Sequence, residues 1–295
     1  LADSLNYKYG EASSLTNIGH YYSALSNYEQ TINYYQQALE ISKQINDTVS
    51  IARCLNYIGV AYARQSNYPL TLDYFFKSLK IQEEINDKWG ISASLNNIGV
   101  IYNYDGNNDL AFEYFNKALK IKEELNDKRG IAKCYNNIGI SYQKQNNNSL
   151  SLEYYQRSLK MNRELENPIE IANCLHNIGI IYISQNKLSE ALVNLNESLK
   201  IHEEINDLYG ISSLKLNISD VYLKEKNYSK ALHYSLQSIE IAKEKGFLEI
   251  QKDNYLVLSK IYFGLAKYKK AYETHVVYKE LNDSIFNKEN IEKIT

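Results

Sequence analysis

The sequence predicts an all-α fold made of stacked helix pairs, and three observations carry that prediction. An eight-residue segment recurs every 40 residues, reading LNYIGVAY from Leu55, LNNIGVIY from Leu95 and LHNIGIIY from Leu175. Within each repeat the apolar residues follow helical spacing and do not alternate as in a strand. Asn-Asp or a similar polar pair closes most repeats. A fixed period of this length indicates a solenoid, in which each unit packs only on its neighbours.

The repeats also divide the chain. Residues 5–10 read LNYKYG and are similar to INDKWG at 85–90. We therefore expect residues 1–9 to be the end of a truncated preceding repeat, residues 10–283 to hold seven repeats, and residues 284–295 to start a capping or linker helix. First helices should begin near residues 10, 48, 88, 128, 168, 208 and 248, and second helices near 29, 69, 109, 149, 189, 229 and 268.

Local signals justify these boundaries. One register position holds a side chain that can cap a helix N-terminus, and its residues are Asp47, Asp87, Asp127, Asn167 and Asp207. Pro168 follows such a cap directly, where its missing N–H costs nothing. Glycine recurs inside the first helices at 19, 59, 99, 139 and 179. A helical glycine costs about 1 kcal/mol against alanine, so its repetition predicts a neighbouring helix too close for a Cβ.

Composition excludes several classes of function. The net charge is −2 and the pI is near 6.3, without the clustered Lys and Arg of a nucleic-acid surface. The sequence contains no run of about 18 apolar residues, so it predicts no membrane-spanning segment. Cys54, Cys134 and Cys174 share one repeat position, which favours small, buried, reduced core residues. No cysteine has a histidine four residues away, so we expect no metal site. We likewise expect no catalytic residues and no cofactor, so this segment should not be an enzyme.

The spacing of the repeat resembles a known family. In the third unit the matching residues are Leu95, Ile98, Gly99, Tyr102, Ala111, Phe115 and Ala118. These offsets are similar to those of the tetratricopeptide repeat, although that repeat usually spans about 34 residues and ends in proline. The resemblance implies a right-handed superhelix of about seven antiparallel helix pairs, with a binding groove on its concave side.

The longer period and the C-terminal LNDSIFNKENIEKIT are similar to the sensor segment of bacterial two-component histidine kinases and related regulators. This resemblance implies a role in signal transduction, with any kinase domain outside the segment. It also implies a periplasmic location, whereas a cytoplasmic one is expected if the resemblance does not hold. An autonomous intracellular scaffold or adaptor is the alternative, and an oligomerisation spacer is a third.

A row of asparagines in the first helices is the candidate binding site. Asparagine is a poor helix former, so its repetition inside helices needs a reason. Its amide can bond the adjacent repeat, or it can bind the backbone of a peptide in the groove, and both roles are open. Beside an apolar row, such amides suit an extended or helical peptide. The predicted contacts are Asn17, Asn56, Asn96, Asn97, Asn136, Asn137, His176, Asn177, Asn217, Val60, Val100, Ile140 and Ile180.

The expected partner is a peptide or protein segment held in this groove. Nucleic acid is not expected, and homodimerisation stays open.

Overall fold

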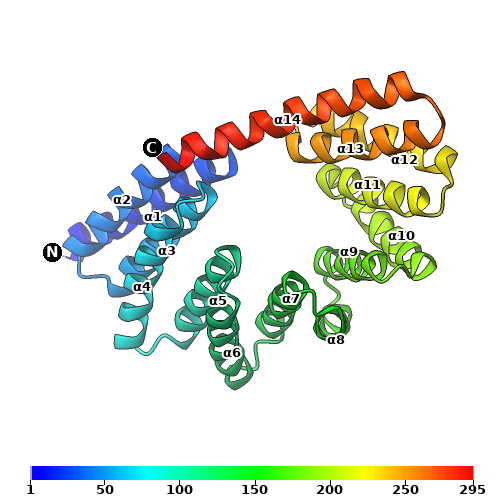
Figure 1. Ribbon diagram of the computed structural model, residues 1–295. Helices are drawn as coiled ribbons and strands as arrows, with labels where there is room; N and C mark the ends of the chain where they lie inside the picture. The colour runs from blue at the N-terminus through cyan, green and yellow to red at the C-terminus, as the bar shows by residue number, and fades with distance from the viewer. Residues whose placement is uncertain (1, 295) are drawn as a thin grey trace. The chain divides into compact units, whose positions relative to one another are not determined.

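In the computed structural model the chain forms fourteen α-helices, and no strand occurs among the residues described (backbone of residues 2–294, side chains of 7–285). Within the two compact units described below, the first and second helices of a repeat pair as predicted: α1 with α2, α3 with α4, α5 with α6, α9 with α10, α11 with α12 and α13 with α14 (Figure 1). The helices are α1 Ala2–Ala24, α2 Tyr28–Gln44, α3 Thr48–Arg64, α4 Tyr68–Glu84, α5 Lys88–Tyr104, α6 Asn108–Glu124, α7 Lys128–Lys144, α8 Asn148–Glu164, α9 Pro168–Ser184, α10 Leu188–Glu204, α11 Leu208–Lys224, α12 Tyr228–Lys245, α13 Leu248–Gly264 and α14 Tyr268–Ile294.

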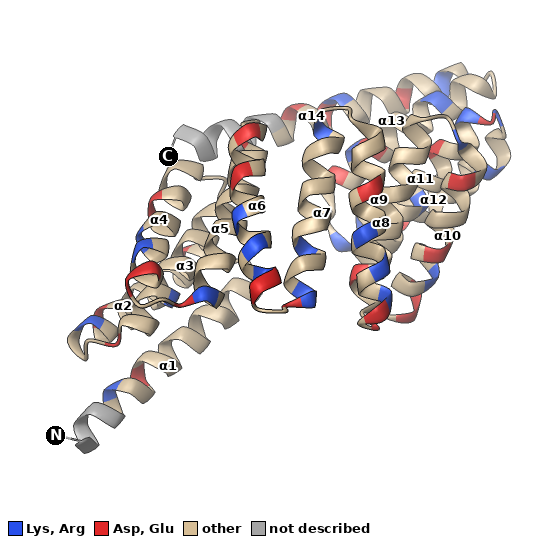
Figure 2. Ribbon diagram, turned by 90° about the horizontal axis from the view of Figure 1, so that it is seen from below, with Lys and Arg blue, Asp and Glu red and all other residues tan. Residues whose placement is uncertain are grey.

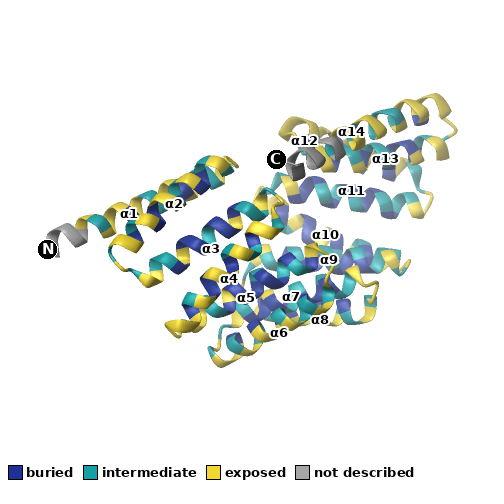
Figure 3. Cartoon of the chain, turned by 60° about the vertical axis from the view of Figure 1, so that its left-hand side comes forward, coloured by how far each residue is buried: buried dark blue, intermediate teal, exposed yellow. Residues whose placement is uncertain are grey.

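The chain divides into two compact units, Leu1–Ser141 and Tyr142–Thr295. In the first, α2 packs on α3 and α4 on α5, which continues the stacking from one helix pair to the next. In the second, α8 packs on α9, α10 on α11 and α12 on α13. Buried residues form the contact faces of the helices, and exposed residues lie on the opposite faces (Figure 3).

One turn geometry joins the helices. Each turn contains a residue in the left-handed conformation, and in six of the described turns it is asparagine with φ of 53–59°. Asn46 N–H donates to Lys43 O and Asp47 N–H donates to Ser42 O, which together close the end of α2. The Asp47 carboxylate then accepts from Ser50 N–H and begins α3. The recurring Asn-Asp pair thus ends one helix and starts the next, which confirms the predicted caps.

The two ends of the chain differ from this pattern. Helix α1 is continuous from Ala2, with no turn before residue 10. Tyr7 stands where later repeats have the capping Asp or Asn, and it lacks a short side-chain acceptor. Helix α14 runs unbroken through residues 281–284 to Ile294, so no separate helix begins after Asp283. In the 20-residue spacing of the turns, position 286 corresponds to the left-handed residue of the earlier turns, and the sequence has Phe there. A bulky residue is strongly disfavoured in the left-handed conformation.

The recurring glycine of the first helix faces a bulky side chain from the second helix of its own repeat, which is an aromatic ring at Gly19, Gly59 and Gly99 and Leu195 at Gly179. A Cβ on Gly59 would lie 2.6 Å from Phe75 Cδ1, and one on Gly99 would lie 2.7 Å from Phe115. Both rings are almost completely buried. The predicted close approach is confirmed, and the side chain of the facing helix, more than its backbone, causes it.

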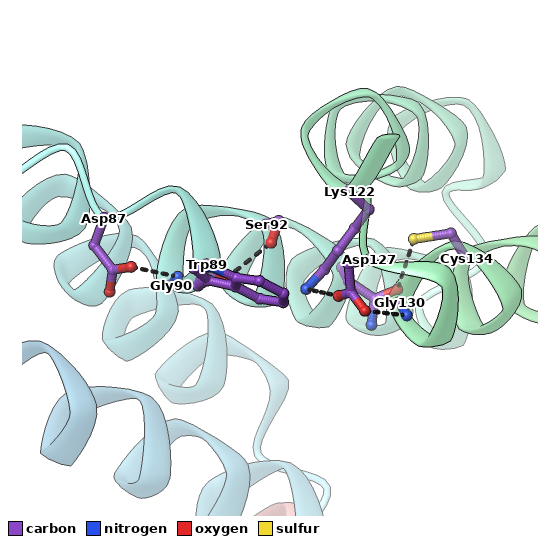
Figure 4. A network of polar contacts seen from close by, with 9 residues as sticks. Asp87, Trp89, Gly90, Ser92, Lys122, Asp127, Gly130 and Cys134 are labelled. Carbon is purple, nitrogen blue, oxygen red and sulfur yellow. Dashed lines mark hydrogen bonds and ion pairs between the residues drawn. The ribbon is translucent and has the colours of Figure 1, made fainter. Parts of the chain in front are cut away.

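A second set of glycines makes room for long polar side chains between repeats. Lys122 is 9% exposed. Its Nζ lies 2.8 Å from Asp127 Oδ2 and 5.0 Å from the centre of the Trp89 ring (Figure 4). Burial opposes the charged form of Asp127, but hydrogen bonds from Lys122 and from Gly130 N–H hold the pKa of Asp127 below its usual range. A Cβ on Gly130 would collide with the Lys122 side chain.

This arrangement recurs wherever the second helix carries a long side chain at the Lys122 position. Long side chains face glycine in the pairs Gln82/Gly90, Lys122/Gly130 and His202/Gly210. Where the side chain is shorter, at Ser42 and Asn162, the residue eight positions later is Ser50 or Glu170 and not glycine. The length of the side chain at the Lys122 position therefore correlates with glycine eight residues later, where a Cβ would collide with a long side chain.

The three cysteines lie in the helix-packing core. Cys54, Cys134 and Cys174 are 3%, 1% and 0% exposed and are not joined in disulfides. Burial raises the pKa of the Cys134 thiol to about 11. The predicted burial is confirmed.

Candidate binding groove

A groove of about 690 Å³ lies on the first-helix side of the first compact unit. It is formed by α3, α5 and α7 together with Tyr68 and Phe75 of α4. Five of the predicted contact residues line it: Val60, Asn96, Asn97, Val100 and Asn137. The valines provide an apolar surface and the asparagines place amides beside it, so five residues predicted from three helices line one face, and their role in binding stays a prediction.

The amides in this groove also bond neighbouring repeats. Asn137 Nδ2 donates to Asn96 Oδ1 at 2.9 Å, and Asn97 Nδ2 donates to Asn56 Oδ1 at 3.5 Å. Each bond joins an asparagine to the residue 41 positions earlier. Asn56 in turn donates to Ser94 Oγ at 3.2 Å. The structural role left open by the sequence is therefore present. These bonds also fix the orientation of the Asn97 and Asn137 amides where they line the groove.

The second compact unit has the same kind of bond with a different acceptor. Asn217 Nδ2 lies 2.6 Å from His176 Nε2. Burial, together with the nearby His202, lowers the pKa of His176 to about 4. The ring is therefore neutral at pH 7, and Nε2 can accept a hydrogen bond as an asparagine oxygen does.

The remaining predicted contacts do not line the groove. Asn17 lies in a smaller pocket of about 190 Å³ between α1 and α3. Asn56 is half-buried behind the groove in its bonds to Ser94 and Asn97. The others, Asn136, Ile140, Asn177 and Ile180, are also half-buried.

Sequence reasoning missed the charged and aromatic parts of the groove. Arg64 and Lys133 line it, and aromatic residues Tyr68, Phe75 and Tyr104 complete its walls. Helical spacing could have identified the two cations. Arg64 lies four residues after Val60, and Lys133 lies four residues before Asn137, so each shares a helix face with a predicted contact.

Among the described residues, no group of three His, Cys, Asp or Glu side chains could hold a metal ion. None of the helices in that part of the chain is both long and apolar enough to cross a membrane.

Comparison with protein families identifies the repeat. A tetratricopeptide repeat model matches residues 10–84 and 90–164, and further models of the same repeat match residues 171–207 and 212–245. The chain belongs to the tetratricopeptide repeat family. No curated protein is similar enough to the chain to count as a relative.

Solved structures share the tetratricopeptide repeat fold. The apo form of RapI has a TM-score of 0.74 at 14% identity, over 94% of this chain and 99% of RapI. The Rap conjugation gene regulator of plasmid pLS20, in complex with the Phr* peptide, has a TM-score of 0.70 at 16% identity, over 95% and 78%. A signal transduction ATPase (STAND) protein with a tetratricopeptide repeat sensor, from Pyrococcus horikoshii, has a TM-score of 0.75 at 17% identity, over 95% and 44%.

Proposed function

We propose that this tetratricopeptide repeat chain is a non-catalytic module that binds a peptide or protein segment in the groove of its first compact unit. The observation that carries the proposal is the combination of an apolar surface with oriented amides in one groove of about 690 Å³. An extended peptide leaves backbone N–H and C=O groups unpaired, and each asparagine amide offers both a donor and an acceptor. Val60 and Val100 lie on the same surface and can contact apolar side chains of the ligand.

The proposed context is the sensory part of a bacterial signalling protein. The Rap regulator of pLS20 was solved with the Phr* peptide, and the Pyrococcus horikoshii protein is described as having a tetratricopeptide repeat sensor. These descriptions belong to those proteins and support the context by analogy of fold. The context predicts a signalling domain outside residues 1–295, whose output changes when the groove is altered. A polypeptide without such a domain favours the adaptor alternative.

Selection from a random peptide library tests the binding function. The purified chain is used to select binders, and the affinity of the best peptide is measured for wild type and for the double variant Val60→Ser/Val100→Ser. Loss of the two apolar contacts should weaken binding at least tenfold, because each buried valine contributes about 1.5 kcal/mol or more. Val193→Ser is the matched control, since Val193 is 67% exposed on α10 in the other unit. Equal binding by the double variant would contradict the proposed site.

A further inference from the structure

The first helices around the groove contain no acidic residue. Helices α3, α5 and α7 each have 17 residues without Asp or Glu. The intervening second helices carry the carboxylates, with three in α4 and four in α6. Figure 2 shows this contrast, since α6 has both acidic and basic bands whereas α7 has only basic ones. Although the chain as a whole has a net charge of −2, the charged residues of these three first helices are all basic.

Three cations of these helices reach the binding surface. Arg64 and Lys133 line the groove, and Arg53 lines the smaller pocket beside Asn17. Among the residues that the structure describes, none of the three has a carboxylate within ion-pair distance, and no Asp or Glu lines either pocket. Lys88 of α5 is different, because its Nζ lies 2.8 Å from Glu124. The groove thus holds cations whose charge is not neutralised by the protein.

The second compact unit shows that this absence of acids is local. Its first helices carry Glu170 in α9, Asp220 in α11, and Glu249 and Asp253 in α13. Asp220 occupies the repeat position that Val100 holds in the groove. A cationic surface is therefore not a property of the repeat in general. It is confined to the units that form the groove.

Unpaired cations beside an apolar surface favour a particular ligand. A cleft that is lined by charges of one sign and has apolar walls focuses the electrostatic field and attracts ligands of the opposite charge. A carboxylate that reaches Arg64 or Lys133 can form charge-assisted hydrogen bonds, which are stronger than neutral ones. In an extended peptide alternate side chains point to opposite sides, so only every second residue faces the groove. These facing residues must include both acidic and apolar side chains if the peptide is to contact the cations and the valines.

We propose that the groove of the first compact unit selects an extended polypeptide segment that combines Asp or Glu with apolar side chains. This inference rests on the proposed function and adds the charge of the ligand. The carboxylates meet Arg64 and Lys133, the apolar side chains meet Val60 and Val100, and the backbone meets the asparagine amides.

The random-library selection described above also tests this charge preference. Peptides selected by the wild-type chain should be enriched in Asp and Glu relative to the starting library. The best binder is then compared with a version in which each Asp and Glu is replaced by Asn and Gln. The amide version should bind at least tenfold more weakly, and the gap should shrink as salt rises from 50 to about 500 mM, because ions screen the contact.

The variant Arg64→Gln/Lys133→Gln should lose most of the preference for the acidic version while still binding the amide version. Lys88→Gln is the matched control, because it removes a cation that already has a partner outside the groove. Equal affinity for the acidic and amide versions would overturn the charge inference and leave the binding function standing. A library that yields no binder at all would instead count against the proposed function itself.

Discussion

Replacing Asn137 by alanine measures how strongly the groove amides hold the repeats together. The substitution removes the 2.9 Å bond to Asn96 Oδ1. Asn96 is 5% exposed, and its oxygen then keeps only the weak Cys134 Sγ contact at 3.9 Å. A buried polar atom left without a good partner costs about 1–3 kcal/mol. We therefore expect a loss of about 1–2 kcal/mol, or roughly 2–8 °C in melting temperature for a cooperative unit of this size.

The sixth and seventh repeats supply a compensating substitution. Leu216 and Val257 occupy the positions of Asn96 and Asn137 there, and both belong to one hydrophobic cluster. Replacing both partners of a buried hydrogen bond by apolar groups can be nearly neutral. The double variant Asn96→Leu/Asn137→Val should therefore recover to within about 1 kcal/mol of wild type.

Urea unfolding of wild type, the single variant and the double variant is the assay. Trp89 is the chain's single tryptophan and lies on α5 with Asn96, so its fluorescence reports this region, and circular dichroism reports the whole chain. An Asn137→Ala protein as stable as wild type would show that the bond contributes nothing. A double variant less stable than the single one would refute the pairing argument. The double variant also separates folding from recognition, because it keeps the packing while removing two groove amides.

Three further predictions concern other parts of the chain. Gly130→Ala should destabilise by about 1–3 kcal/mol by displacing the lysine packed against it, whereas Gly10→Ala should be neutral or stabilising, since no atom lies within 4 Å of its Cβ; urea unfolding checks both. The pKa of His176 is lowered from 6.5 to about 4 in the folded chain. As the pH falls between these two values, the unfolded chain therefore binds a proton at this histidine while the native chain does not. Stability should thus drop by roughly 3 kcal/mol between pH 7 and 4, and His176→Asn should abolish that part of the drop. Thiol titration at pH 8 should be slow for the native chain and give three thiols on unfolding, because burial raises the pKa of cysteines such as Cys134.

The fold was predictable because its signals are local. A helix start needs one capping side chain and a few backbone amides, and a helix end needs one residue that tolerates the left-handed conformation. Both requirements fall within adjacent residues such as Asn46 and Asp47, so a single sequence displays them. Where the local signal fails, the structure differs. Tyr7 leaves α1 without an internal cap, and Phe286 lets α14 continue.

The groove was predictable only in part because it is assembled from several repeats. Periodicity predicted that Val60, Val100 and Asn97 share one face, since those positions follow from helix geometry alone, and all three line the groove. It could not show which side chains of one repeat reach the next, because that depends on the rotation between repeats and on side-chain length. Arg64 and Lys133 enter the groove from α3 and α7, two helices on either side of α5. Neither position carries a cation in every repeat, so the repeat itself does not mark them, and only their helical spacing from Val60 and Asn137 does.

From position 56 onward, the two residues 41 positions apart at this contact are either both polar or both apolar. Asn56 and Asn97 are both amides, and Leu216 and Val257 are both apolar. A residue that served only a ligand would have no reason to change with a residue of the next repeat, whereas two residues in contact must. Stacking therefore limits what the amide positions can become. Arg64 lies two turns after Asn56, and Lys133 lies one turn before Asn137. Neither takes part in these bonds between repeats, so a tetratricopeptide repeat groove can change its ligand chemistry there without loosening its repeats.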